Sequence, residues 1–130
     1  MESDGTATVI DGSTHLELVL PADPQLLRIV RLVASGLASL ADLDLDGVEE
    51  IRVAADELVS TLIEASAGEP ISVRFTVTDD ALRLEASTPL ASGATLTVDP
   101  MVDRVLAAVS TRHEWRTDDG VAHGFVERSR

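Results

Sequence analysis

The sequence predicts an α/β (α+β) sandwich, in which a mixed, mostly antiparallel sheet carries three helices on one face. Three observations lead to this prediction. The 130 residues are 45% hydrophobic but include only two Phe, one Trp and no Tyr, so the core must be aliphatic. Apolar residues recur at helical spacing in some stretches and alternate as in strands in others. The order along the chain is strand, two helices, two strands, helix and two strands.

Residues 1–14 are predicted to be a flexible leader, and residues 15–130 a single domain. The leader is acidic and polar, unlike a secretory signal, and no apolar run is long enough to cross a bilayer. We therefore expect a cytoplasmic protein that does not enter a membrane. The first strand follows at once, because residues 15–20 alternate apolar and polar side chains.

A helix is predicted from Asp23 to about Leu40, since Asp23 can cap its start and Pro24 suits its first position. Its polar strip is narrow and consists of Arg28, Arg31, Ser35 and Ser39. Apolar residues cover most of the remaining circumference, which is more than a helix needs in order to lie on one sheet. Either the helix is enclosed within the domain, or part of it is a contact surface for another protein.

The rest of the domain is organised around a helix predicted over residues 46–66, with Asp46 as its cap and Glu49 reaching back to the cap. One side is an apolar stripe made of Val48, Ile51, Ala55, Leu58 and Leu62. The opposite side carries Glu50, Glu57, Thr61 and Glu64. Glu57 and Thr61 are one turn apart, so both can act on one ligand; alternatively, this side is simply exposed to water.

The C-terminal half is predicted to form two hairpins separated by a helix. Residues 71–77 and 82–86 alternate as strands around a turn, and residues 88–95 form a loop of small residues. Asp99 and Pro100 begin a helix over residues 101–110. The closing hairpin comprises residues 112–117 and 121–127 around a turn at Asp118, Asp119 and Gly120.

Composition excludes or disfavours several kinds of chemistry. Without Cys there are no disulfides, thiolate metal sites or Cys nucleophiles, and without Lys there is no Schiff base or P-loop lysine. The net charge of −13 disfavours direct nucleic-acid binding and suits a basic protein partner. The histidines lack metal-motif spacing: in the simplest register of the closing hairpin His123 pairs with Arg116, and His113 shares the other face with Trp115. We therefore expect no metal site.

Three segments together carry a family resemblance: residues 18–40 with Arg31, residues 43–66 with the Ala-Ala-Asp-Glu run that ends at Glu57, and the hairpin that follows. From about His15 to Val126 the chain resembles the anti-sigma-factor branch of the GHKL ATPases, a fold also found in gyrase and in histidine kinases. The likeness is greatest to actinobacterial anti-sigma factors that regulate stress-type sigma factors. The resemblance implies the GHKL (histidine-kinase-like ATPase) fold for residues 15–130.

The family's second helix carries Glu-x-x-x-Asn, in which Glu is the general base and Asn holds the magnesium that bridges the ATP phosphates. By the resemblance, Glu57 is a vestigial general base, and Thr61 stands at the Asn position, where a hydroxyl is a poorer magnesium ligand. The family's adenine-reading Asp-x-Gly-x-Gly corresponds to a stretch with only Ser87 and Thr88 near that place, and the glycine-rich lid is missing. The implied cofactor-binding residues are Glu57, Thr61 and Ser87, without a metal anchor or a phosphate cradle.

The resemblance implies an anti-sigma factor that sequesters a sigma factor by contact, is released by an anti-anti-sigma (STAS-type) protein, and needs no cofactor because it turns over no ATP. Arg28 and Arg31 are the expected partner contacts, unless both are solvated or pair with nearby acids. The alternative is an active serine kinase that binds ATP with Mg²⁺ and phosphorylates the anti-anti-sigma protein. A third is a regulatory module whose vacated cleft takes another small molecule or none. Relatives of this kind are often homodimers, and the sequence does not show which surface would pair.

Overall fold

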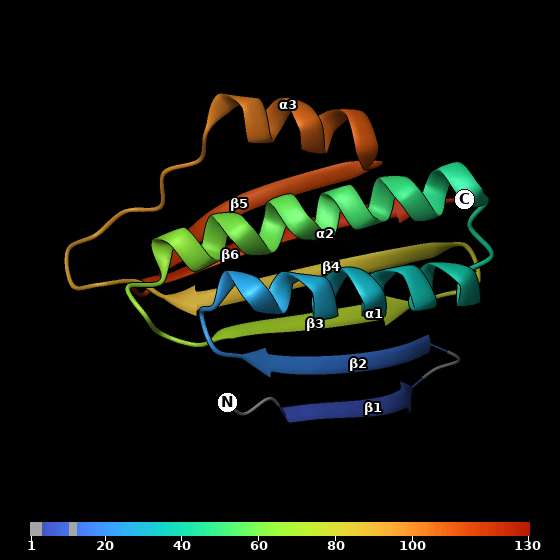
Figure 1. The fold of residues 1–130 in the computed structure, drawn as a ribbon, viewed down its shortest axis with the longest axis horizontal. Coiled ribbons are helices and arrows are strands. Elements are labelled where there is room, and N and C mark those ends of the chain that lie inside the picture. Colours follow the sequence, from blue (N-terminus) through green and yellow to red (C-terminus); the bar gives the residue numbers. More distant parts are fainter. Residues whose placement is uncertain (1–3, 11–12) are drawn as a thin grey trace.

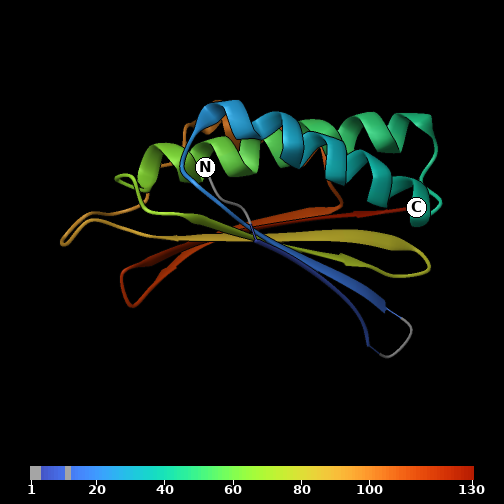
Figure 2. The same ribbon diagram turned by 60° about the horizontal axis from the view of Figure 1, so that its bottom comes forward.

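One antiparallel sheet carries three helices on one face, in the residues that the computed structural model describes, 4–10 and 13–130 (Figure 1). The strand order is β1-β2-β3-β4-β6-β5, with bounds Asp4–Ile10 (β1), Ser13–Leu20 (β2), Ile71–Val77 (β3), Ala81–Pro89 (β4), Arg112–Asp118 (β5) and Val121–Ser129 (β6). The helices are α1 (Leu27–Leu40), which follows a 3-10 turn over Pro24–Leu26, α2 (Leu45–Ala65) and α3 (Pro100–Val109). Figure 2 shows that the opposite face of the sheet has no helix over it. The predicted α+β class is confirmed.

The sheet is not mixed, because every strand pair in the described residues is antiparallel. Between β2 and β3 the chain passes through two antiparallel helices, which return it to the end of the sheet where β2 finished, so β3 runs back along β2 (Figure 1). Between β4 and β5 it passes through a single helix, which would make those two strands parallel neighbours. The final strand β6 lies between β4 and β5 and is antiparallel to both.

The region predicted as a flexible leader contains a strand. β1 pairs with β2 in antiparallel register from Asp4 opposite Val19 to Ile10 opposite Ser13. Without β1 the outer edge of β2 would present unpaired N–H and C=O groups, so pairing satisfies the backbone of β2 and leaves β1 as the edge strand. The prediction is therefore corrected for residues 4–10 and for residues 13–14, which begin β2, while residues 1–3 and 11–12 lie outside the described residues.

The central helix α2 begins slightly earlier than predicted. Asp44, not Asp46, is its N-cap, and the Asp44 carboxylate accepts a hydrogen bond of 2.8 Å from the N–H of Gly47. Gly47 is buried against the preceding turn, where an added Cβ would lie 3.1 Å from the Cβ of Leu43. This close approach fixes the helix start, and it leaves Asp46 in the first turn, where its charge still favours the helix dipole.

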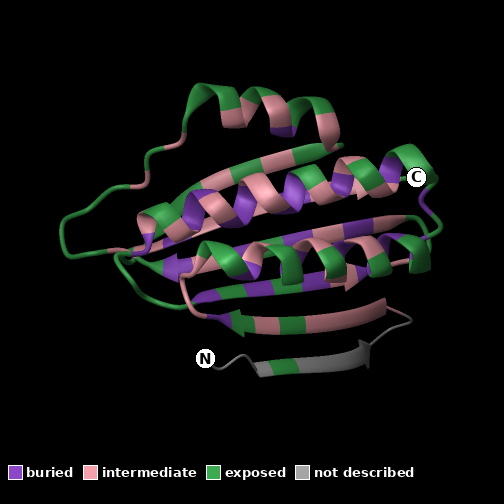
Figure 3. Ribbon diagram, in the orientation of Figure 1, coloured by how far each residue is buried: buried purple, intermediate pink, exposed green. Residues whose placement is uncertain are grey.

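The core lies between the helices and the sheet and is aliphatic, as predicted (Figure 3). The strand alternation is confirmed, because the core side of β3 and β4 consists of Ile71, Val73, Phe75, Val77, Leu82, Leu84 and Ala86, all buried. The predicted α2 stripe is also confirmed at Ile51, Ala55, Leu58 and Leu62, which are 0% exposed. Within the described residues, no helix is both long and apolar enough to cross a bilayer.

Helix α3 contacts the core through apolar side chains and contacts β5 through one aspartate. Its only buried residue is Leu106. The Asp103 carboxylate accepts a 3.0 Å hydrogen bond from the indole N–H of Trp115, and the same oxygen lies 3.1 Å from Nε2 of His113. His113 and Trp115 share the helix-facing side of β5, and Arg116 lies opposite His123, both as predicted.

Candidate functional site

The two predicted residues of α2 differ in their surroundings. Glu57 is partly exposed, but Thr61 is buried, with 8% of its surface exposed. The Thr61 hydroxyl donates a 2.8 Å hydrogen bond to the main-chain carbonyl of Glu57. The prediction that Thr61 lies on the outer side with Glu57 is therefore wrong: at 100° per residue, Thr61 falls within the buried arc beside Leu58 and Leu62.

Glu57 lies among other carboxylates. Burial raises the pKa of the Glu57 carboxyl above its ordinary value, and the negative charges of Asp56, Asp99 and Glu64 raise it further. Asp99 is the N-cap of α3, so the start of that helix adds a carboxylate to the neighbourhood of α2. Phosphate groups are also negative, and these surroundings oppose a triphosphate unless a cation accompanies it.

Ser87 is not brought together with Glu57 and Thr61. It lies on β4 between Ser72 of β3 and His123 of β6, and its side chain lines a hollow on the sheet face that carries no helix. The next residue, Thr88, points to the helix side, where it is 1% exposed and its hydroxyl donates a 3.0 Å bond to the carbonyl of Pro70. Strand alternation thus separates Ser87 from α2, which corrects its grouping with Glu57 in one nucleotide site.

The segment between β4 and α3, residues 90–99, lies where the resemblance places a lid. It is mostly exposed, and only Leu90 and Leu96 pack partly against the core. Its single glycine, Gly93, has a φ of +78° and forms a turn closed by a 2.9 Å bond from Ala94 N–H to the Ala91 carbonyl. Figure 1 shows this segment projecting past the end of the sheet before it returns to α3. One turn glycine does not provide the row of N–H groups that cradles phosphates.

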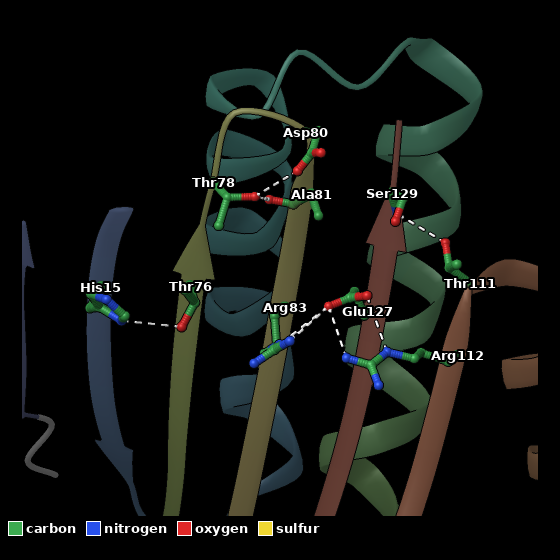
Figure 4. Close-up of polar contacts among 10 residues, drawn as sticks. All are labelled: His15, Thr76, Thr78, Asp80, Ala81, Arg83, Thr111, Arg112, Glu127 and Ser129. Atoms are coloured by element: carbon green, nitrogen blue, oxygen red, sulfur yellow. Dashed lines mark hydrogen bonds and ion pairs between the residues drawn. The ribbon is translucent and has the colours of Figure 1, made fainter. Parts of the chain in front are cut away.

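The histidines lie apart on three strands. His15 of β2 contacts the hydroxyl of Thr76 at 3.2 Å (Figure 4), His113 contacts Asp103, and His123 lies on β6. In the described part of the chain, no three His, Asp or Glu side chains are close enough to hold a metal ion.

Arg31 and Arg28, the predicted partner contacts, lie on α1 in different states. Arg31 forms an ion pair with Asp56 of α2, whereas Arg28 is exposed. The two side chains of the Arg31–Asp56 pair are 38% and 34% exposed, so a partner could still reach it. The alternative that these arginines pair with nearby acids is thus confirmed for Arg31.

The outer side of α1 is apolar and exposed. Leu32 and Leu40 are 75% and 68% exposed, and Ile29 is 36% exposed, while Val30, Ala34, Leu37 and Ala38 face the core. Helix α1 is therefore not enclosed within the domain, and its surplus apolar residues lie on the molecular surface. Of the two interpretations left open by the sequence, this arrangement favours a contact surface.

The open face of the sheet carries a polar cluster that the sequence analysis missed. Glu127 of β6 accepts hydrogen bonds from Arg83 of β4 (3.0 Å) and Arg112 of β5 (3.2 Å), as Figure 4 shows. Both guanidinium carbons lie 5.1 Å from the ring centre of Phe125. The hydrogen bond from Arg112, aided by that from Arg83, holds the pKa of Glu127 below its ordinary value although burial opposes this. Charged residues at every second position of β5, together with Arg83 and Glu85 of β4, are the signal that identifies this face.

A hollow of about 530 Å³ lies beside this cluster, lined among others by Glu17, Arg74, Glu85, Ser87 and His123. A smaller one of about 140 Å³ lies near the start of α2. Neither is lined by Glu57 or Thr61. In the described residues, Glu57 therefore has other carboxylates near it and lines neither of the two hollows.

No protein-family model matches the chain. Over 74 residues it is 31% identical to "Serine-protein kinase RsbW" of Bacillus velezensis, a match covering 54% of this chain and 46% of that protein. It is 28% identical over 78 residues to the protein of that name from Bacillus subtilis, covering 57% and 49%, and 32% identical over 76 residues to that from Bacillus licheniformis, covering 54% and 47%. The chain is similar to serine-protein kinases RsbW. It spans about half the length of these curated relatives.

Proposed function

We propose that the chain is an anti-sigma factor on a GHKL-type scaffold, which sequesters a sigma factor by protein–protein binding and turns over no ATP. The observation that carries this proposal is a contrast within one helical layer. Helix α1 exposes Leu32 and Leu40 to solvent, whereas Glu57 of α2 lies among carboxylates. The similarity to serine-protein kinases RsbW supports the scaffold, and the contrast supports binding over catalysis.

The partner surface is assigned to α1. Its exposed apolar side chains lie next to Arg28, so a sigma factor would bury apolar area and meet a cation at the same place. Arg31 is available once a partner carboxylate competes with Asp56. The chain as a whole is strongly acidic, with a net charge of −13, which suits a partner with a basic surface.

The absence of ATP turnover is inferred from what phosphoryl transfer requires. Nearly all of its catalysis comes from positioning the phosphates and neutralising their charge, and a general base alone contributes little. Glu57 remains at the position of the base, but the Thr61 hydroxyl is committed to a main-chain carbonyl and is buried. The loop over residues 90–99 has one glycine and no cation. Glu57 is thus proposed as a vestige of the general base.

Sigma-factor binding is tested with purified stress-type sigma factors and an Arg28→Glu variant. The wild-type chain should bind one of them, and Arg28→Glu should weaken that binding about tenfold, since it replaces an attractive charge with a repulsive one. Arg104→Glu, at another exposed helical position on α3, is the matched control and should bind as wild type does. The absence of binding to every sigma factor tested would refute the proposal.

The second candidate function is an active serine kinase, which the name of the relatives favours. It requires Mg²⁺-dependent ATP binding near Glu57. We expect calorimetry at millimolar ATP with Mg²⁺ to give no binding heat. A saturable heat that disappears in Glu57→Ala, together with phosphate transfer to an anti-anti-sigma protein, would establish the kinase instead.

Release by an anti-anti-sigma (STAS-type) protein, homodimer formation and a cytoplasmic location are further parts of the proposal. A preformed complex with the sigma factor should dissociate when the anti-anti-sigma protein is added without nucleotide. Analytical ultracentrifugation of the wild-type chain measures the oligomeric state directly. Dissociation only in the presence of ATP would favour the kinase.

A further inference from the structure

Gly36 has no role in the fold of this chain. It lies in the middle of α1, is exposed, and a Cβ added to it would meet no atom within 4 Å. Its φ is not positive, unlike those of Gly68, Gly93 and Gly120. Glycine inside a helix is less stable than alanine, because it loses more backbone freedom on folding. Neither conformation nor internal packing therefore requires glycine at this position.

The surroundings of Gly36 are apolar and open. At 100° per residue, Gly36 lies on the same side of α1 as Ile29, Leu32 and Leu40, one turn from each leucine. The leucines are 75% and 68% exposed, so they stand on either side of a gap that has no side chain. Helices pack by placing the side chains of one into the gaps of the other, and small residues allow the two backbones to approach closely.

The charge at the end of this surface indicates the kind of partner. Just beyond Leu40, the connector to α2 and its first turn carry three exposed acids, Asp42, Asp44 and Asp46. A second copy packed over this end of α1 would bring the same acids next to these, and the two sets would repel one another. A helix with an apolar side and basic residues next to it would instead be attracted to these acids.

We propose that Gly36 is the crossing point for a basic amphipathic helix of the sequestered protein, which packs between Leu32 and Leu40 and directs basic residues toward Asp42 and Asp46. This rests on the proposed function and adds to it the class of segment that the partner presents. Close approach at the crossing point is the reason for glycine, and its cost in helix stability is offset by binding.

The test compares stability and binding in Gly36→Ala and Gly36→Leu, using a purified stress-type sigma factor that the wild-type chain binds. Gly36→Ala should raise the melting temperature by about 3 °C, because alanine favours the helix. The same variant should weaken sigma-factor binding about tenfold, and Gly36→Leu more than about a hundredfold, since each added group separates the two helices. Ala107→Leu on α3, another exposed helical position, is the control and should leave binding unchanged.

The outcomes separate this inference from the function on which it rests. A rise in stability together with a loss of affinity in Gly36→Ala supports the crossing point, since a purely structural role would change both in the same direction. If the Gly36→Leu variant binds the sigma factor as tightly as the wild-type chain does, the crossing point is refuted and the proposed function is not. A loss of self-association in Gly36→Leu, measured by ultracentrifugation, would identify a second copy as the occupant and also overturn it. A wild-type chain that binds no sigma factor refutes both proposals.

Discussion

Glu57 and Glu127 are two carboxylates whose surroundings move their pKa values in opposite directions. Burial and neighbouring acids raise the pKa of Glu57 on α2, and hydrogen bonds from two arginines lower the pKa of Glu127 on β6. The ionised form is therefore disfavoured at Glu57 and favoured at Glu127. At the scale of single residues, this difference distinguishes a site that tolerates an unfavourable charge from one that contributes to stability.

Replacing Glu57 by Gln should stabilise the fold at neutral pH. A carboxyl whose folded pKa is raised binds its proton more tightly in the folded state, so stability falls as pH rises from about 4.5 through the folded pKa. Gln removes that charge, and the gain should disappear at pH 4 and below, where wild-type Glu57 is protonated. Urea denaturation at several pH values measures this; a loss of stability at pH 7 would contradict it.

Gly124 is required by packing. A Cβ at this position would lie 2.4 Å from Leu58 Cδ1 and 2.8 Å from Trp115 Cζ3, so an added methyl group must displace α2 or the indole. We expect Gly124→Ala to destabilise the fold by about 1–3 kcal/mol, as overpacking does. It should also shift the fluorescence of Trp115, the single tryptophan. Gly36→Ala is the control and should leave the fluorescence unchanged.

At the scale of elements, Glu127 joins three neighbouring strands. Arg83 comes from β4, Arg112 from β5 and Glu127 from β6, so one carboxylate links the three strands at the β5 edge of the sheet. The arginines are partly exposed, at 40% and 57%, and water weakens their interaction, whereas Glu127 is 17% exposed. The cluster is therefore expected to contribute modestly, and to do so only while Glu127 is ionised.

Glu127→Gln should destabilise the fold by about 1 kcal/mol at pH 7. Because the folded pKa of Glu127 is lowered, its contribution is fully present above about pH 4.5 and is lost as pH falls through the folded pKa. The difference from wild type should thus shrink on acidification, which is measured by urea midpoints between pH 7 and 3. A difference that is independent of pH would show that the ion pairs are not its origin.

Thr61 lies on the buried side of α2. Asn at this position would supply the magnesium ligand that the proposed scaffold implies, but the position is buried, and a larger amide must enter the core. Thr61→Asn should therefore destabilise the fold by about 1–3 kcal/mol and should not create Mg²⁺-dependent ATP binding. Thr61→Val, which keeps the shape, should stay within about 1 kcal/mol of wild type. Mg²⁺-dependent ATP binding by Thr61→Asn would show that this single substitution is enough to create a nucleotide site.

At the scale of the whole molecule, the net charge of −13 affects folding and binding in opposite ways. Like charges repel in the compact state, and salt screens them over about 8–10 Å. Raising NaCl from 20 to 200 mM should raise the melting temperature by about 2–4 °C and weaken binding of a basic partner. A melting temperature that falls with salt would indicate that the ion pairs dominate over the net charge.

Much of the fold follows from periodicity. The alternation of Ile71, Val73, Phe75 and Val77 predicts a strand with one buried side, and the structure buries those four residues. The α2 stripe and the start of α3 at Asp99 are likewise local patterns, since each depends on residues within one or two turns. The candidate site is harder to predict from the sequence: Glu57 lies on α2 as predicted, but Thr61 is buried and Ser87 lies on the other face of the sheet.

The sequence by itself determined the class of the fold, the aliphatic core, the caps at Asp23 and Asp99 and the register of Arg116 with His123, because spacing and capping act over short distances. Only the tertiary structure decided that β6 lies between β4 and β5, that β1 covers the edge of β2, and that Arg31 meets Asp56. These contacts join residues far apart in the chain. Their free energy depends on which surfaces pack together, and that is a property of the whole fold.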